Sequence, residues 1–191
     1  MQLDDSARGF SFSHDGPLDM RMDSGQPLTA HTLVNTLGAD ELAGLLERFG
    51  EERFAARIAR RIVEERRRAP ITTTTQLARV VCAAVPGASR HGRVHAATRT
   101  FQALRIAVND ELAALEACLD GVSDVLRPGG RAVVVTFHSL EDRLVKRRFA
   151  DGAREERWTL LTKKPVRASE AEVSNNPRAR SAKLRAVERC A

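Results

Sequence analysis

Residues 137–143, with the sequence FHSLEDR, carry the side chains best suited to chemistry in this 191-residue chain. His138 and Ser139 can each hydrogen-bond a substrate, while Glu141 and Asp142 are suited to capping a helix that follows them. No G-x-S-x-G elbow surrounds Ser139, so a hydrolytic serine is not indicated. For His138 two interpretations stay open, a contact with substrate and a structural hydrogen bond.

Residues 132–137 (AVVVTF) precede this group and predict a strand. The strand has no polar face, which is typical of a strand inside a parallel sheet that is covered on both sides. It ends just before His138, and open α/β sheets place their ligands at that end of a strand. Gly129 and Gly130 precede the strand, whereas a phosphate-binding loop follows its strand, so we interpret them as a turn. The chain contains neither a G-x-G-x-x-G motif nor a Walker A motif.

Charge is unevenly distributed along the chain. The formal net charge is +6 and the sequence pI is about 10.0, but residues 127–191 hold 16 Lys and Arg against 8 Asp and Glu, a net charge of +8. A basic segment of this kind indicates a polyanionic partner, nucleic acid before membrane, with a solvated basic surface as the alternative. Aromatic residues make up 4% of the chain and Tyr is absent, which argues against a base-stacking platform built from several aromatics.

The sequence gives no sign of a membrane segment or a metal site. No run of about 18 apolar residues and no signal-peptide pattern occur, so we expect a cytoplasmic protein without a membrane partner. Cys82 and Cys118 lie in apolar helical stretches, where small buried hydrophobes are expected. His91 and His95 have a metal-ligand spacing, but no cysteine pair completes it, and we expect no metal site.

Helices outnumber strands in the predicted structure. Residues 1–28 fit neither the helical nor the strand period of apolar residues, and they predict a long loop. Thr73 and Gln76 have the spacing of a capping box at the start of a helix. Gly121 is expected to divide one long helical stretch into two helices. The predicted helices fall within residues 31–68, 72–85, 97–126 and 141–149, and the later strands within 158–162 and 182–187. So few strands for so many helices indicate a piece of a larger α/β protein.

Five blocks of sequence point to a known family. They read QLDD..RGFSF..DGPLDMRMD, FGEERFA.RIAR.IV, ATRTFQALRIAVNDEL, L.PGGR..V.TFHSLEDR.VKR and NPRARSAKLRA.ER, in that order. Together they resemble the RsmH (MraW) family of 16S ribosomal RNA cytosine-N4 methyltransferases. The resemblance covers residues 2–189, effectively the whole chain.

The resemblance implies an α/β fold, a partial class I (Rossmann-like) S-adenosylmethionine methyltransferase core with an inserted helical domain. The implied segments are residues 1–30 (core segment and active-site loop), 31–98 (inserted helical domain for RNA recognition) and 99–191 (C-terminal half of the core). The implied reaction is methylation of a cytosine in the decoding region of 16S rRNA within the 30S subunit. These 191 residues lack the family's Gly-rich cofactor loop, so we expect a truncated chain, with the missing neighbours of strand 132–137 in the absent portion.

The resemblance also implies roles for individual residues. By its position Gln2 contacts S-adenosylmethionine. The pocket for the target base is expected to be lined by Asp15, Asp19, Arg21 and Asp23, and RNA phosphates are expected to contact Arg99, Arg105, Arg143 and Lys146. His138 and Ser139 stay candidate catalytic residues, and no general base is identified.

Two other functions stay open beside an rRNA methyltransferase. One is a non-catalytic RNA-binding remnant of the same family, and the other is a helical interaction module with no RNA role. RNA binding that weakens steeply with salt favours the first two, because phosphate contacts release counterions. Absent or salt-insensitive binding favours the interaction module.

Overall fold

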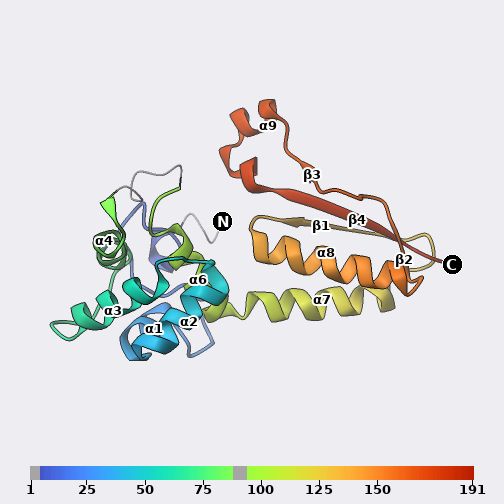
Figure 1. Ribbon diagram of the computed structural model, residues 1–191. Helices are drawn as coiled ribbons and strands as arrows, with labels where there is room; N and C mark the ends of the chain where they lie inside the picture. Colours follow the sequence, from blue (N-terminus) through green and yellow to red (C-terminus); the bar gives the residue numbers. More distant parts are fainter. Residues whose placement is uncertain (1–4, 88–93) are drawn as a thin grey trace. The chain divides into compact units, whose positions relative to one another are not determined.

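The computed structural model describes residues 5–87 and 94–191 and divides the chain into two compact units (Figure 1). The first unit comprises residues 1–111 and the second residues 112–191. Each unit has a hydrophobic core of its own. The three-part division expected from the family resemblance, with boundaries at residues 30 and 98, stays a prediction.

The first unit begins with a long loop and continues as a set of short helices. In the loop the structure describes one short 3-10 helix, η2 (Ser6–Arg8), and the remainder is irregular, as the sequence predicted. The helices are α1 (Ala30–Thr36), α2 (Ala39–Gly50), α3 (Ala55–Arg66), α4 (Thr74–Ala84) and α6 (Thr98–Asn109).

The apolar faces predicted from periodicity form the core of this unit. Leu42 and Leu46 in α2, and Ile58 and Ile62 in α3, are fully buried, each pair lying one helical turn apart. Burying an aliphatic side chain of this size stabilises the fold by roughly 1.5–3 kcal/mol. The charged residues of α3 face outward, which places its arginine-rich face in solvent.

Helix ends follow local capping chemistry, with one correction to the prediction. The capping box is confirmed, since the Thr73 side chain accepts from the Gln76 N–H and the Gln76 side chain accepts from the Thr73 N–H. The predicted division at Gly121 is wrong, because Gly121 lies inside α7 (Glu111–Val125). The division falls instead at Asp110, which caps α6 in the left-handed conformation (φ 48°) that short polar residues tolerate.

The second unit packs helices against one face of a small antiparallel sheet. Its strands are β1 (Arg131–Thr136), β2 (Trp158–Leu160), β3 (Val166–Arg167) and β4 (Lys183–Arg189), and its helices are α7, α8 (Ser139–Arg154), the short α9 (Glu170–Asn175) and the 3-10 helix η3 (Pro177–Ser181). β4 is the common partner of the other three strands, in the order β1-β4-β2 with β3 also paired to β4. The two late strands predicted within residues 158–162 and 182–187 are present as β2 and β4, and they pair antiparallel.

The core of this unit lies between α7, α8 and the sheet. It is formed by Leu119 of α7, Val145 and Phe149 of α8, and Trp158 and Val187 of the sheet. Trp158 is the only tryptophan of the chain, so its fluorescence reports on this unit.

The strand predicted at residues 132–137 is confirmed as β1, whereas its place inside a parallel sheet covered on both faces stays a prediction, because the neighbours expected for it are not among these residues. Among the described residues β1 is an edge strand, paired antiparallel with β4 alone. Its burial alternates, because Ala132 and Thr136 face the helices while Val133 (57% exposed) and Val135 (48% exposed) face away from them. The strand is apolar on two faces, but described elements cover only one.

Two smaller observations concern the cysteines and the length of the apolar helices. Cys118 is exposed on α7, so its predicted role as a buried hydrophobe is wrong, and Cys82 is only partly buried. The described helices include none with the length and apolar character needed to cross a membrane.

Candidate functional site

The group His138–Glu141 forms the cap of α8 at the carboxyl end of β1. His138 is the N-cap residue, and its Nδ1 accepts a hydrogen bond from the Glu141 N–H at 3.4 Å. In return Glu141 Oε2 accepts from the N–H groups of Phe137 (2.8 Å) and His138 (3.2 Å). This capping box satisfies backbone donors that the first turn of a helix leaves unpaired.

Glu141 is ionised in this arrangement. Its burial raises the pKa of the carboxyl group, but the nearby His138 side chain and the hydrogen bonds from the backbone N–H groups of Phe137 and His138 more than offset this, so the pKa lies below its usual value. A carboxylate with a lowered pKa is a weak proton acceptor at neutral pH. Glu141 therefore serves the cap and is poorly suited to act as a general base.

The unusual feature of the cap is the histidine. Ser, Thr, Asp and Asn are the favoured N-cap residues. Because Nδ1 of His138 accepts a hydrogen bond, the neutral ring carries its proton on Nε2. That buried Nε2 lies 3.2 Å from Glu141 Oε1, yet among the described residues it makes no hydrogen bond of adequate geometry. The arrangement leaves a nitrogen donor without a well-oriented acceptor at the end of β1.

Asp142 ties this end of α8 to β4. Its two carboxylate oxygens accept from Lys183 Nζ at 2.9 Å and from Arg185 Nε at 2.7 Å. Partial burial raises the pKa of Asp142, but Arg185 and Lys183 lower it by more than this, so the pKa lies below its usual value. Glu141 and Asp142 both lie in the first turn of α8, where acidic residues were predicted to suit the helix start; Glu141 accepts the capping hydrogen bonds, while Asp142 also forms a bridge between helix and sheet.

The other predicted residues of α8 are exposed. Ser139 occupies the first helical position, and Arg143 and Lys146 follow on the outer surface. The structure therefore brings His138 and Ser139 together at one helix end, with the two cationic side chains farther along the same helix.

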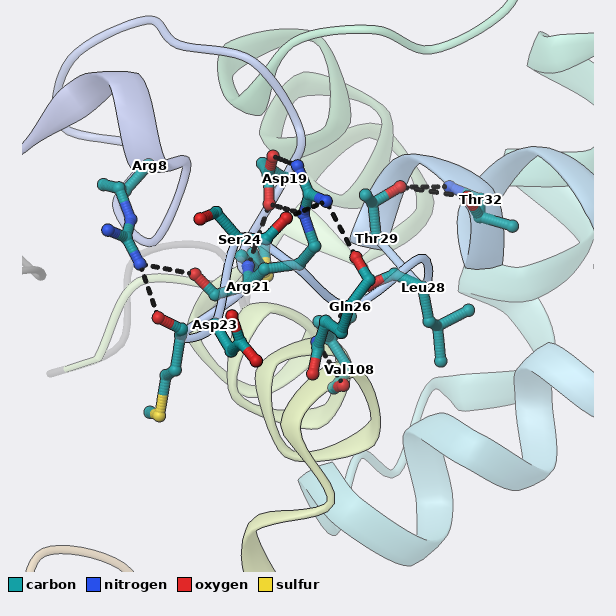
Figure 2. A network of polar contacts seen from close by, with 12 residues as sticks. Arg8, Asp19, Arg21, Asp23, Ser24, Gln26, Leu28, Thr29, Thr32 and Val108 are labelled. Atoms are coloured by element: carbon teal, nitrogen blue, oxygen red, sulfur yellow. Dashed lines mark hydrogen bonds and ion pairs between the residues drawn. The ribbon is translucent and has the colours of Figure 1, made fainter.

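In the first unit, Asp19 and Arg21 are locked together in the long loop (Figure 2). Arg21 Nε and Nη2 both donate to the Asp19 carboxylate at 2.8 Å, and Arg21 Nη1 donates to the carbonyl oxygens of Ser24 and Gln26 at 2.8 Å each. The side-chain hydrogen bond from Arg21 lowers the pKa of Asp19, outweighing partial burial. The pair holds the loop in shape, so its donors and acceptors are largely occupied.

The backbone of this loop is strained at one residue and well anchored around it. Met20 is fully buried with φ 65°, a conformation that costs a non-glycine residue on the order of 1 kcal/mol. Its N–H donates to Arg8 O, and its carbonyl oxygen accepts from Asn109 Nδ2 at 2.8 Å. The Asn109 Oδ1 accepts from the Met22 N–H at 2.7 Å. The end of α6 thereby fixes the loop in one conformation.

Asp15 and Asp23 have different surroundings. The Asp15 carboxylate accepts from the Thr75 hydroxyl at 2.6 Å and from the Thr75 N–H at 3.2 Å, and these bonds lower its pKa. Asp15 therefore binds the start of α4. Asp23 is exposed and accepts only from the Gly25 N–H through Oδ1, among the described residues, which leaves Oδ2 facing solvent.

The two arginines predicted on α6 have structural partners. Arg105 makes a two-point ion pair with Glu111 at 2.7 and 2.9 Å, and Arg99 donates to the Glu51 carbonyl oxygen at 3.1 Å. Gln2, the predicted cofactor contact, and His91 lie outside the described residues. The roles predicted for all of these side chains stay predictions.

Sequence reasoning missed several residues that shape these sites. Asn109 anchors the loop, and Lys183 and Arg185 neutralise Asp142 across 41 and 43 residues of chain. No local pattern marks such partners, because they meet only through the fold. The one local signal that could have drawn attention to this loop is the alternation of charged and apolar residues after Pro17.

Comparison with known proteins gives the family directly. A family model described as the MraW methylase family matches residues 1–190. Three similar relatives are each named ribosomal RNA small subunit methyltransferase H. The relative from Symbiobacterium thermophilum is 52% identical over 97% of this chain, that from Synechococcus elongatus 53% over 98%, and that from Acidobacterium capsulatum 55% over 99%.

The chain therefore belongs to the MraW methylase family, as the sequence blocks predicted, and its α/β fold class agrees with this. The chain spans only 63%, 62% and 62% of the lengths of these three relatives.

Proposed function

We propose that this protein acts in S-adenosylmethionine-dependent methylation of 16S rRNA, transferring a methyl group to N4 of a cytosine in the decoding region of the 30S subunit. The observation that carries the proposal is the 52–55% identity to rRNA small subunit methyltransferases over nearly the whole chain. The sulfonium of the cofactor supplies an activated methyl group, and the exocyclic amine of cytosine accepts it and releases a proton.

The residues that the structure describes do not form a complete site for this cofactor. At the carboxyl end of β1, Glu141 is occupied by the cap of α8 and Asp142 by two cations. Gln2 lies outside the described residues. The roles proposed for the described residues therefore concern the RNA substrate.

The anchored loop of residues 19–26 is proposed to hold the target base. A cytosine must leave its stack to be methylated, and the loop that receives it must keep its shape to align the amine. Asp23 is the best placed of the four predicted loop residues, because its free Oδ2 can accept a hydrogen bond from the cytosine amine. Asp19 and Arg21 are proposed to keep the loop rigid, and Asp15 to fix it to α4.

His138 is proposed to contact the RNA substrate through its Nε2–H. In this structure the Nε2 atom is buried 3.2 Å from Glu141 Oε1 without a well-oriented acceptor, so a phosphate or carbonyl oxygen of RNA would satisfy it once the ring turns outward. Arg143 and Lys146, exposed on the same helix, are proposed to add phosphate contacts, and Ser139 a further hydrogen bond.

The proposal is tested by incubating the protein with 30S subunits and S-adenosylmethionine and measuring N4-methylcytidine by mass spectrometry. Titration calorimetry with the cofactor accompanies this assay. We expect Asp23→Asn to lower methylation about tenfold, the value of one lost charge-assisted hydrogen bond, with thermal stability unchanged because Asn keeps the bond to Gly25. Asp40→Asn, another exposed acidic residue of the first unit, is the matched control.

The outcomes separate the functions under consideration. A folded protein that binds RNA but neither binds the cofactor nor methylates would favour the non-catalytic RNA-binding remnant. A folded protein that binds neither would favour the helical interaction module.

A further inference from the structure

A basic arm, defined as residues 161–183, stands between β2 and β4 in the second unit. It contains β3, α9 and η3, and in Figure 1 it runs from β2 through β3, beside β4, to α9 (orange to red). Its charged residues are Lys163, Lys164, Arg167, Arg178, Arg180 and Lys183, against Glu170 and Glu172. The arm therefore carries a net charge of +4.

Most cations of the arm have no acidic partner. Lys163, Lys164, Arg167 and Arg180 are exposed, and their side chains form no ion pair or hydrogen bond with any residue that the structure describes. Several arginines in the rest of this unit do have acidic partners. Arg131 pairs with Glu188, Arg154 with Asp151 and Arg157 with Glu155. Residues 112–191 hold 16 Lys and Arg against 11 Asp and Glu, a net charge of +5, so most of the net positive charge of the second unit lies on the arm.

The strand pairing of the arm places like charges together. Arg167 of β3 lies directly opposite Lys183 of β4, so the two side chains project from the same face of the sheet. Like charges directly opposite each other destabilise a strand pair. Lys183 also shares the single carboxylate of Asp142 with Arg185, so two cations contact one anion and Arg167 stands opposite one of them. A bound polyanion would turn this repulsion into attraction.

We propose that the arm is an RNA-binding surface that contacts phosphates along a single-stranded segment. The inference rests on the proposed function and adds to it the surface that the RNA follows. The arm contains no aromatic residue, so its contacts are with the backbone of the RNA rather than by base stacking. A membrane surface fits less well, because α9 is a six-residue polar helix (EAEVSN) without an apolar face.

The test is fluorescence anisotropy of a labelled single-stranded 16S rRNA oligonucleotide titrated with the protein at several salt concentrations. The arm variant combines Lys163→Gln, Lys164→Gln and Arg180→Gln. The control variant combines Arg131→Gln, Arg154→Gln and Arg157→Gln, which removes the same charge from residues that have acidic partners.

We expect the arm variant to bind at least about tenfold more weakly than wild type at low salt. The slope of log affinity against log salt concentration should fall by about 2, since each phosphate contact to a single strand contributes about 0.7. The control variant should stay close to wild type. Equal weakening in both variants would mean that net charge alone matters, and unchanged binding by the arm variant would equally overturn the proposal.

A second variant separates binding from folding. Arg167→Gln removes the like-charge pair with Lys183, so we expect thermal stability to stay equal or rise while RNA affinity falls. Stability and affinity falling together would contradict the proposal. Displacement of the RNA by polyglutamate at equal charge concentration would also overturn it, in favour of an acidic protein partner.

Failure of the arm proposal is distinguishable from failure of the proposed function. If wild type methylates 30S subunits and the arm variant binds the oligonucleotide as well as wild type does, only the arm proposal is overturned. If a folded protein shows neither methylation nor RNA binding, both the arm proposal and the proposed function are overturned.

Discussion

Asp142 is the residue on which the charge balance of the second unit depends. It is the anion shared by Lys183 and the buried Arg185. We expect Asp142→Asn to lower the free energy of unfolding by about 2 kcal/mol, because Arg185 is left without its counter-charge. The value is below that of a deeply buried pair, since Asp142 and Lys183 keep contact with water. Urea unfolding followed by Trp158 fluorescence measures it.

The pH dependence gives a check on the same prediction. The pKa of Asp142 is lower in the folded state than its ordinary value of 3.8, so its contribution is fully present above that value and is lost as the pH falls through the folded pKa. The difference between wild type and Asp142→Asn should therefore shrink below about pH 4. Asp120→Asn, which removes an exposed partner of Arg148, should change stability by less than about 1 kcal/mol.

His138 allows a structural role and a substrate contact to be separated. Asn is a favoured N-cap residue, so we expect His138→Asn to keep the stability of the protein within about 0.5 kcal/mol. Asn lacks the Nε2–H, so methylation of 30S subunits should fall about tenfold if that group binds RNA. His138→Ala should instead lose about 1 kcal/mol of stability. Full methylation activity in a stable His138→Asn protein would mean that His138 only caps α8 and does not contact RNA.

Among the elements, α8 packs closely on Trp158 of β2 because it has a glycine at the point of contact. A Cβ atom added at Gly152 would lie 2.1 Å from the Trp158 ring, whereas one added at Gly121 in α7 would meet no atom within 4 Å. Alanine in place of glycine stabilises a helix by about 1 kcal/mol where space is open. We therefore expect Gly121→Ala to stabilise the protein and Gly152→Ala to destabilise it by about 1–3 kcal/mol through overpacking.

Thermal unfolding monitored by Trp158 fluorescence distinguishes the two glycine variants. A stabilising Gly152→Ala would contradict the close packing of α8 on the tryptophan. A destabilising Gly121→Ala would mean that the open position on α7 has a contact that packing alone does not reveal.

For the whole molecule, the exposed edge of the sheet offers a site at which another chain can pair. In the described part of the chain, β1 has no strand partner on its second edge, and Val133, Val135 and Phe137 are about half exposed. An apolar edge strand is a template for pairing with another chain. We expect this 191-residue chain to self-associate as concentration rises, and Val133→Lys to reduce the association without loss of stability.

Light scattering after gel filtration measures this association. Val125→Lys on α7 changes an exposed valine (80%) away from the sheet and is the matched control. Equal reduction of association by both variants would show that added charge, and not the sheet edge, is responsible.

Local patterns along the chain were sufficient for most of the secondary structure and for the family. The i, i+4 faces of α2 and α3 and the capping box at Thr73 were predictable because each depends on residues within one or two turns. Family membership was predictable because five long blocks were matched together. The helix break at Asp110 was missed because the sequence does not mark an aspartate that adopts the left-handed conformation. A glycine is the usual sign of a helix end, so the break was predicted at Gly121 instead.

The tertiary structure alone decided which side chains of the candidate sites are available. The sequence determined that charged residues occur in the loop of residues 15–23 and along residues 137–147, but not that Arg21 is bound to Asp19 or Arg105 to Glu111. It also could not determine that Lys183 faces both Arg167 and Asp142. Ion pairs and strand register join residues distant in the chain, and their geometry exists only after the chain has folded.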